Sequence, residues 1–177
     1  MKTENIYLRA TEKGDIDFLY NLENDIELWK YGAVFQPISK DEIERFVIRS
    51  MKYDIYTMRQ LRFIICRNDD NSRVGCIDIT DFNPKNMRAS IGIVILKSDR
   101  NKGYADESLK LVTKYCFNIL NLKQLYCEID SKNIISQNLF TNNGFCLSGI
   151  KKQWIIAENG VWHDILFYQN INEQIHA

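Results

Sequence analysis

The stretch that most constrains the fold runs from Met87 to Leu120, where an apolar segment is followed by a basic glycine turn and an amphipathic segment. Residues 90–96 (SIGIVIL) form an almost unbroken apolar run, which is typical of a strand covered on both faces. After the turn, apolar residues recur at spacings of four and three, which mark one face of a helix. They are Ala105, Leu109, Val112, Cys116 and Ile119. The sequence therefore predicts a central strand that leads directly into a helix.

The turn between this strand and this helix, Arg100 to Ala105, has the features of an anion site. A helix N-terminus leaves backbone N–H groups unpaired, and its dipole favours negative charge. Arg100 and Lys102 add two positive charges, whereas Asp106 and Glu107 oppose a bound anion. The turn lacks both the P-loop pattern and the G-x-G-x-x-G pattern. Taken alone, it is equally well explained as a pyrophosphate cradle or as an ordinary cationic turn.

The segments that follow this helix favour the pyrophosphate cradle. Gln124 to Asp130 alternates as a strand, and Asn133 is a good N-cap for a short helix that reaches about Asn143. Gly144-Phe145 then ends that helix. The order is thus strand, glycine turn, long helix, strand and short helix.

These motifs resemble those of the GNAT acyltransferase superfamily. Arg100-x-x-Gly103-x-Ala105 is similar to its acyl-CoA pyrophosphate loop, and Asn133-x-x-Ser136 with Asn143-Gly144-Phe145 is similar to a later motif. The resemblance runs from Ile6 to about Gln169. It is greatest to the spermidine acetyltransferase and ribosomal-protein N-acetyltransferase branches, notably through Phe117-x-x-Leu120-Asn121-Leu122-x-x-Leu125-Tyr126.

The resemblance, together with the segment patterns, predicts one GNAT domain over residues 1–177, a mixed α/β sheet of about seven strands and about four helices. Residues 87–96 and 124–130 are expected to be neighbouring strands that splay apart to hold acyl-CoA. The other expected strands are 6–10, 61–67, 74–80, 145–157 and 161–169. The other expected helices are one after Asp15 and one that begins at the capping box Ser39-x-x-Glu42 and continues to about Tyr56.

Composition narrows the class of protein. A chain of 177 residues that is 45% hydrophobic suits one domain with a substantial core. Lys+Arg and Asp+Glu are balanced at 23 each, so no charge excess points to nucleic acid or to an anionic membrane surface. No apolar run is long enough to span a bilayer and no signal-peptide core is present, so we expect a cytoplasmic protein.

The cysteines and histidines give no metal-binding pattern. The five cysteines, Cys66, Cys76, Cys116, Cys127 and Cys146, lie in apolar segments without paired metal spacing, and we expect buried, reduced thiols. His163 and His176 have no Cys or His neighbour at ligand spacing, so no metal is predicted.

The resemblance also implies how acetyl-CoA, the expected cosubstrate, is held. Backbone around Ile93, Val94 and Ile95 would contact the pantetheine arm and the thioester carbonyl. The pyrophosphate would lie on Arg100, Asn101, Lys102, Gly103, Tyr104 and Ala105. The side chain of Asn133 would contact the CoA arm in addition to capping its helix.

Acetyl transfer to an amine also requires proton transfer. Amines are mostly protonated at neutral pH, so a base or a water chain is expected. Candidates are Asp78, Asp81, Glu128 and Asp130, although for each the sequence favours a solvated or salt-bridged edge residue.

The proton donor to the thiolate is where the chain departs from the family. Many GNAT enzymes have a tyrosine four residues before the glycine of Gly-Phe, and this chain has Phe140 there. Ser136 and Tyr104 are the nearest substitutes by motif, and the alternative is that the thiolate leaves unprotonated. Ser136 could instead only hydrogen-bond backbone.

The sequence thus predicts an acetyl-CoA-dependent N-acetyltransferase in which a primary amine attacks the thioester directly, since no cysteine falls within the CoA motif. The acceptor would be a polyamine such as spermidine, or another small amine. Alternatives are a protein N-terminal (ribosomal-protein-type) acetyltransferase and a non-catalytic acyl-CoA-binding domain, which Phe140 favours. Family habit suggests a homodimer.

Acceptor specificity is the least constrained feature. Polyamine acetyltransferases that the chain resembles carry acids where this chain has Phe35, Gln36 and Ser90. Negative potential could instead come from the end of the first helix, and large aromatic side chains could line an acceptor pocket. The acids are Glu23, Asp25 and Glu27, and the aromatics are Trp29, Tyr31, Trp154 and Trp162.

Overall fold

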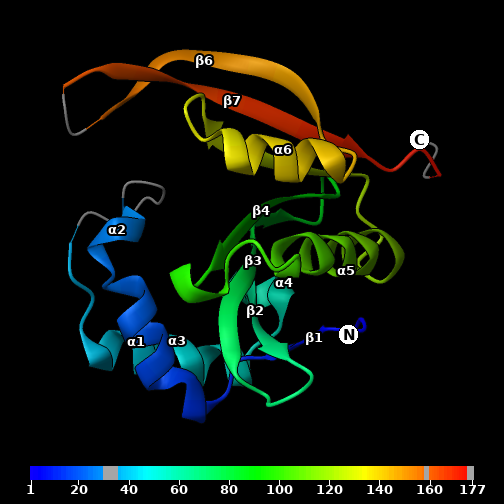
Figure 1. Ribbon diagram of the computed structural model, residues 1–177. Helices are drawn as coiled ribbons and strands as arrows, with labels where there is room; N and C mark the ends of the chain where they lie inside the picture. The colour runs from blue at the N-terminus through cyan, green and yellow to red at the C-terminus, as the bar shows by residue number, and fades with distance from the viewer. Residues whose placement is uncertain (30–35, 158–159, 175–177) are drawn as a thin grey trace.

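The computed structural model describes residues 1–29, 36–157 and 160–174, and these residues form one mixed sheet with helices on both faces (Figure 1). The seven strands are ordered β1-β2-β3-β4-β5-β7-β6, and only the β4–β5 pair is parallel. Their bounds are β1 Ile6–Ala10, β2 Leu61–Arg67, β3 Arg73–Asn83, β4 Arg88–Ile95, β5 Gln124–Asp130, β6 Cys146–Ile156 and β7 Trp162–Ile171. The prediction of a mixed seven-stranded sheet is confirmed.

Six α-helices occur in the described part of the chain, including the four that the sequence predicted. They are α1 Ile16–Glu23, α2 Ile26–Trp29, α3 Lys40–Lys52, α4 Ile55–Met58, α5 Tyr104–Asn118 and α6 Ile134–Asn142. Two 3-10 turns, η1 Lys13–Asp15 and η2 Lys97–Asp99, precede α1 and follow β4. The two additional helices, α2 and α4, are single turns that are too short to show a helical period.

The expected continuation of the second helix to about Tyr56 is wrong. Helix α3 ends at Lys52 because Tyr53 adopts an extended conformation, with φ −116° and ψ 148°. Asp54 then caps a separate turn, α4, and its carboxylate accepts a hydrogen bond from the Thr57 N–H at 2.9 Å. An aspartate at this position starts a new helix rather than continuing the old one.

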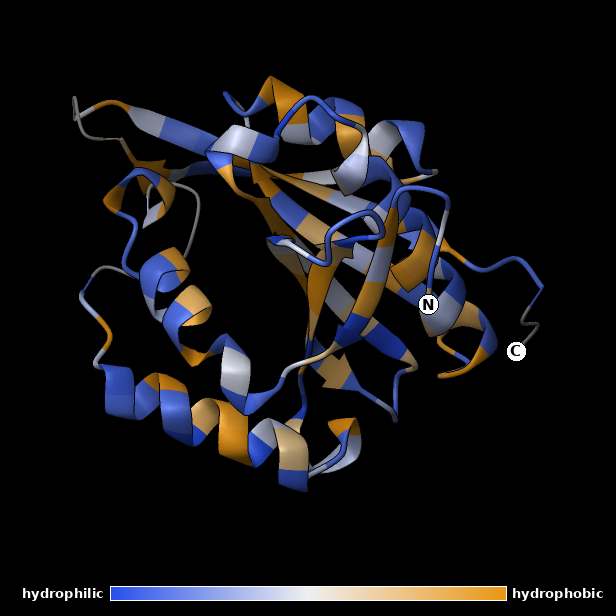
Figure 2. Ribbon diagram, turned by 60° about the horizontal axis from the view of Figure 1, so that its bottom comes forward, coloured by the Kyte–Doolittle hydropathy of each residue, from blue (hydrophilic) through white to orange (hydrophobic). Residues whose placement is uncertain are grey.

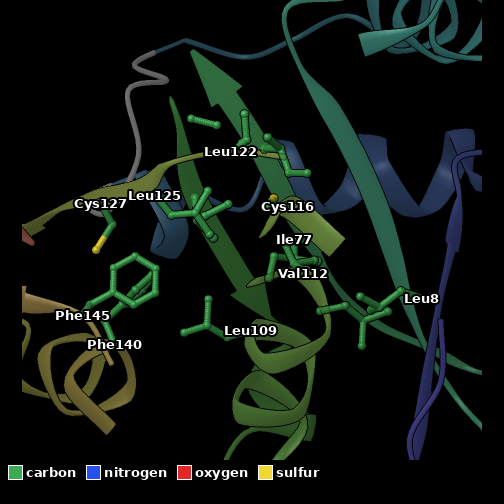
Figure 3. Packing of buried hydrophobic residues seen from close by; sticks show 14 of the residues in the cluster. Leu8, Ile77, Leu109, Val112, Cys116, Leu122, Leu125, Cys127, Phe140 and Phe145 are labelled. Atoms are coloured by element: carbon green, nitrogen blue, oxygen red, sulfur yellow. The ribbon is translucent and has the colours of Figure 1, made fainter. Parts of the chain in front are cut away.

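Two hydrophobic clusters fix the layers. On one face of the sheet, Leu109, Val112 and Cys116 of α5 are fully buried in a cluster that includes Ile77 of β3 and Leu125 of β5 (Figure 3). On the other face, residues of α1 and α3 form a second cluster with β2 and β3. Figure 2 shows hydrophobic residues concentrated in the strands at the centre of the molecule. Each face of the sheet therefore packs against helices, but β4 is not fully covered as its apolar run predicted, because Gly92 is exposed.

Two residues expected to be buried are exposed. Ile119 is 65% exposed because α5 ends just before it, and it serves as the C-cap. Cys146 is exposed at the start of edge strand β6, whereas Cys66, Cys76, Cys116 and Cys127 are buried free thiols as expected. In the residues that the structure describes, no helix is both long and apolar enough to cross a membrane.

A buried ion-pair cluster fixes the start of α1. The Asp15 side chain is fully buried and accepts from Arg9 at 2.7 Å, from Arg73 at 2.6 Å and from the Glu12 N–H at 2.8 Å. Burial alone raises the pKa of the Asp15 carboxyl, but these hydrogen bonds outweigh it and hold the pKa below its ordinary value. The cluster joins β1, β3 and the first turn of α1.

Shortening a core side chain of α5 tests the packing of this helix. We expect Leu109→Ala to lower the free energy of unfolding by about 2–5 kcal/mol, because a fully buried leucine leaves a cavity. The matched control is Ile119→Ala on the exposed end of the same helix, which should change it by less than about 0.5 kcal/mol. Urea unfolding measures both, and equal losses in the two variants would contradict the packing described.

Candidate active site

The site is built on the divergence of β4 and β5. The two strands pair only through Arg88 with Gln124, Ala89 with Leu125 and Ser90 with Tyr126. Beyond these pairs, β4 continues along β3 as far as Ile95, and β5 continues along β7 as far as Asp130. Backbone groups of residues 91–95 that face β5 therefore have no strand partner there. We call this gap between residues 91–95 and 127–130 the β4–β5 opening, and it confirms the splayed strands that were expected.

A close backbone contact holds the second half of β4 against β3. Gly75 lies opposite Ile95, and a Cβ at Gly75 would lie 2.1 Å from the Val94 carbonyl oxygen. Only glycine fits such an approach. The part of β4 that leaves β5 is thus fixed by its other neighbour, so the β4–β5 opening is rigid on that side.

The loop after β4 leaves the N-terminus of α5 open. Gly103 is the N-cap residue with φ 83°, and Asn101 also has a positive φ of 62°. No side chain caps the helix, so the first backbone N–H groups of α5 stay available to an anion. Arg100 Nε donates to the Ile95 carbonyl at 3.2 Å, which ties the loop to the end of β4, and Lys102 pairs with Asp99 at 2.8 Å.

The two acids in the first turn of α5 are already engaged. Asp106 pairs with Lys110 at 2.7 Å and accepts from the Asn143 amide at 2.9 Å. The hydrogen bond from Lys110 is the main cause that lowers the pKa of Asp106 below its ordinary value. Glu107 accepts hydrogen bonds from Thr3 and from Asn5. Because both carboxylates have partners, the opposition to a bound anion that the sequence suggested is reduced.

Tyr104, the first residue of α5, lies toward the N-terminal segment. It packs against the main core cluster and lines a hollow of about 260 Å³ together with Glu4, Asn5, Asn68 and Asp69. These neighbours come from the chain before β1 and from the turn after β2. Ala105 is half-buried and packs against the same core cluster.

The start of α6 lies directly after β5. Asn133 caps the helix as predicted, because its side-chain oxygen accepts from the Ser136 N–H at 3.1 Å, and its own N–H donates to the Asp130 carbonyl at 2.8 Å. Ser136 is half-buried, and its hydroxyl makes no hydrogen bond with any residue that the structure describes. The expected bond of that hydroxyl to backbone is therefore absent here.

Phe140, at the position of the family's usual tyrosine, is a core residue. It is 4% exposed, and its ring meets Phe145 edge-on at a centroid distance of 5.0 Å (Figure 3). A phenyl ring in this position has no proton to donate. The proton route in this chain must therefore use another group or solvent.

One face of the sheet beside the β4–β5 opening carries side chains that alternate along β3, β4, β5 and β7. We call it the acceptor face, and its residues are Asp78, Ser90, Gly92, Tyr126, Glu128, Asp130 and His163. Asp78 lies opposite Gly92, and a Cβ at Gly92 would meet no atom within 4 Å. Arg62 donates to both oxygens of Asp78, at 2.7 and 2.9 Å, and also pairs with Glu23 of α1. This network joins the end of α1 to the sheet, next to the open space above Gly92.

The other acids proposed as bases also have partners. Asp81 accepts from the Tyr126 hydroxyl, and burial followed by this hydrogen bond raises the pKa of Tyr126 above its ordinary value. Glu128 pairs with Lys151 at 2.5 Å. Asp130 lies 3.0 Å from His163 Nδ1. The sequence pattern did not indicate this contact, and His163 was considered only as a metal ligand. The cross-strand neighbour of a strand residue cannot be predicted from the local sequence.

The described residues contain no group of three or more His, Cys, Asp or Glu side chains placed to hold a metal ion.

Of the aromatic candidates for an acceptor pocket, Trp154 and Trp162 are 59% and 55% exposed on the β6–β7 hairpin. Trp29 donates its indole N–H to the Glu23 carbonyl at 2.8 Å. Tyr31 and Phe35 lie outside the described residues.

The open helix terminus and the β4–β5 opening are the two features expected of an acyl-CoA-dependent N-acyltransferase. Comparison with known families agrees, because residues 5–146 match the model of the acetyltransferase (GNAT) domain. This chain therefore belongs to the GNAT acetyltransferase family, and it is an N-acetyltransferase whose acyl donor is acetyl-CoA.

Curated relatives cover most of the chain. It is 27% identical over 147 residues to the spermidine N(1)-acetyltransferase of Escherichia coli K12, which covers 82% of this chain and 75% of that protein. It is 26% identical over 159 residues to the spermidine N(1)-acetyltransferase of Vibrio cholerae, with 89% and 88% covered.

Solved structures show the same fold. The spermidine N-acetyltransferase of Vibrio cholerae, crystallised with CoA and spermine, superposes with a TM-score of 0.85 at 24% identity, covering 96% of both chains. A dodecameric form of that enzyme gives a TM-score of 0.80, also at 24% identity, and covers 96% of this chain and 95% of that chain. At this identity the similarity establishes the fold.

A substitution at Gly103 tests the loop as part of the cofactor site. We expect Gly103→Ala to weaken acetyl-CoA binding by about 5–30-fold, since a left-handed conformation costs a non-glycine residue about 1–2 kcal/mol and the loop can relax when no anion is bound. The control is Gly149→Ala on β6, where the new Cβ would make an ordinary 3.9 Å contact. Titration calorimetry measures both, and unchanged affinity in Gly103→Ala would contradict this role.

Proposed function

We propose that this N-acetyltransferase transfers acetyl from acetyl-CoA to a primary amine of a polyamine such as spermidine, or of another small amine, by direct attack on the thioester. Two kinds of support combine. The curated relatives described above are named for spermidine, and one solved relative was crystallised with spermine. The acceptor face of this chain also carries an excess of carboxylates.

The charge of the acceptor face is the observation that carries the proposal. Among the residues that the structure describes, five carboxylates lie on this face or directly beside it, on α1, β3 and β5, against the cations Arg62, Arg88 and Lys151 and the nearby Lys132. They are Glu23, Asp78, Asp81, Glu128 and Asp130. Although most are paired, the excess negative charge at the β4–β5 opening favours a cationic substrate over an anionic one. Polyamines and other small amines meet this requirement.

The cofactor residues act through backbone and fixed charge. When bound, acetyl-CoA supplies the activated acyl group as a thioester. Along the β5-facing edge of β4, backbone around Ile93, Val94 and Ile95 would orient the arm, and an N–H group on that edge would stabilise the carbonyl oxygen as negative charge develops. Residues 100–105 would hold the pyrophosphate with loop and helix N–H groups, and Arg100 and Lys102 would add positive charge. Asn133 would contact the arm where α6 begins.

The proton for the departing thiolate would come from Ser136 or from solvent. Ser136 lies in the first turn of α6 next to Asn133, and its hydroxyl has no partner among the described residues. Tyr104, the other candidate, lies beside Glu4 and Asn5 at the N-terminal segment. Because a CoA thiol has ordinary acidity, an unprotonated thiolate is also a tolerable leaving group, and the loss of the usual tyrosine need not abolish turnover.

Three positions at which the polyamine enzymes carry acids differ in this chain, so a second class of acceptor also has to be tested. Ser90 lies on the acceptor face in place of an acid, Gln36 is exposed, and Phe35 lies outside the described residues. A peptide N-terminus is the alternative acceptor. We further propose that the protein acts in the cytoplasm. We also propose that it forms a homo-oligomer, in line with the dodecameric form of the Vibrio cholerae relative.

The first test is CoA release from acetyl-CoA with a panel of amines. We expect turnover clearly above acetyl-CoA hydrolysis with spermidine, spermine or putrescine, because the acceptor face carries excess negative charge. Aminoglycosides and short peptides with free N-termini complete the panel, and acetyl-CoA without amine is the control. Turnover with peptides alone would replace the polyamine proposal by a protein N-terminal one. Bound acetyl-CoA without turnover on any amine would indicate a non-catalytic acyl-CoA-binding domain.

A pair of side-chain truncations tests the source of the proton. We expect Ser136→Ala to lower kcat by about tenfold while acetyl-CoA affinity is unchanged, and Tyr104→Phe to leave kcat unchanged. Ser148→Ala is the matched control, because that hydroxyl is exposed and donates to the nearby Cys146 carbonyl. Steady-state kinetics with the best amine measures all three. An unchanged kcat in Ser136→Ala would favour an unprotonated leaving group.

A further inference from the structure

We propose that His163, oriented by Asp130, is the base that removes the proton from the attacking amine. The proposal rests on the N-acetyltransferase function proposed above and adds a catalytic residue on β7 that no motif of the sequence indicates. Three features of the structure carry it: the geometry of the His–Asp pair, its attachment to the start of α6, and its place on the acceptor face.

The geometry of the pair fixes the histidine. His163 Nδ1 lies 3.0 and 3.1 Å from the two oxygens of Asp130, and their side chains are 14% and 20% exposed. A carboxylate only accepts hydrogen bonds, so Nδ1 carries a hydrogen, and in the neutral ring the lone pair is therefore on Nε2. No residue that the structure describes bonds to Nε2. A ring held through one nitrogen with the other available has the arrangement of a general base.

Asp130 is itself held in place. Its carboxylate accepts from the Lys132 N–H at 2.9 Å, and its backbone carbonyl accepts from the Asn133 N–H at 2.8 Å. The amide of Gln137 on α6 also donates to this carbonyl, at 3.4 Å. The turn that orients His163 is therefore the turn that presents Asn133 and the start of α6 to the cofactor, so base and donor are positioned by the same few residues.

Strand register places the pair on the acceptor face. Tyr126 is paired with Ser90 of β4, so Asp130, four residues further along β5, points to the same side as Ser90 and Gly92. Asp130 is paired with Ile165 of β7, and His163, two residues before it, shares that face. Figure 1 shows the end of the β6–β7 hairpin, where β7 begins, on the same side of the molecule as α2.

Neighbouring charges leave His163 as the available base. On β5 and β6, Glu128 is paired with Lys151 at 2.5 Å. Next to His163 on β7, Asp164 is paired with Lys152 at 2.8 Å and also accepts from the Gln153 N–H. In the described part of the chain, Lys132 carries a further nearby charge, in the turn after β5. A carboxylate paired with lysine is a weak proton acceptor, whereas neutral imidazole accepts a proton in the physiological pH range.

The proton balance is complete with this residue. The acceptor arrives as an ammonium ion, and His163 Nε2 takes one proton and later releases it to solvent. The nitrogen lone pair then forms the C–N bond while the C–S bond breaks. The amide nitrogen loses its second proton, which passes to the thiolate through Ser136, through water or through bulk solvent. The products are the N-acetylated amine, CoA thiol and one proton.

The test is the pH dependence of kcat/KM in His163→Gln, whose amide keeps a hydrogen-bond donor for Asp130. The wild-type value should be nearly constant above neutrality, because the enzyme removes the proton itself. The variant can only use the rare free amine, so its value should lie about 100-fold lower at pH 7 and rise about tenfold per pH unit toward the wild-type value. Acetyl-CoA affinity should not change.

Two further variants complete the experiment. Asp130→Asn should show the same pH-dependent loss, since an amide can donate to Nδ1 and place the ring hydrogen on Nε2, and it carries the test if His163→Gln does not fold. Asp164→Asn, on the adjacent residue of β7, is the control and should match wild type. A loss that is equal at all pH values, or no loss, would overturn the role of His163. Absence of wild-type turnover with every amine would overturn the proposed function and this inference together.

Discussion

The parallel contact between β4 and β5, limited to three residue pairs, is the interaction on which the rest of the site depends. If the hydrogen-bond ladder between β4 and β5 continued past Ser90 and Tyr126, the β5-facing backbone groups between Ile93 and Ile95 would be hydrogen-bonded to β5. Instead β3 holds β4 through the close approach at Gly75, and β7 holds β5 to its last residue. The sheet stays continuous although β4 and β5 separate after three pairs. The cofactor can then pair with the backbone of β4 in the place where β5 is missing.

The same arrangement supplies the charges of the site. Gly103 begins α5 beside the end of β4, so loop amides, the helix dipole and Arg100 act at one mouth of the β4–β5 opening. The two acids of the first helical turn have partners drawn from the N-terminal segment, from α5 and from the residue after α6. On the acceptor face, ion pairs join Asp78 to Arg62 and Glu128 to Lys151, and a hydrogen bond from His163 fixes Asp130.

The absence of the usual tyrosine changes how the proton steps are distributed. Phe140 is packed against Phe145 in the core, so this part of α6 contributes stability rather than proton transfer. Ser136 and the His163–Asp130 pair flank the same turn, from Asp130 to Asn133. In this chain the base and the donor would therefore both be organised by the segment that links β5 to α6, and the pH profile is the property that reports on it.

The sequence by itself determined most of the elements and predicted the cofactor half of the site. Apolar period, the glycine turn and the Asn133 cap are local signals, because they arise from contacts within a few residues of chain. It did not show that α3 stops at Lys52, that Ile119 and Cys146 are exposed, or that Asp106 and Glu107 have side-chain partners. Above all, tertiary structure alone decided that His163 meets Asp130, since strand register joins residues 33 positions apart. Local pattern fixes which residues form a strand, and only packing fixes which strands become neighbours.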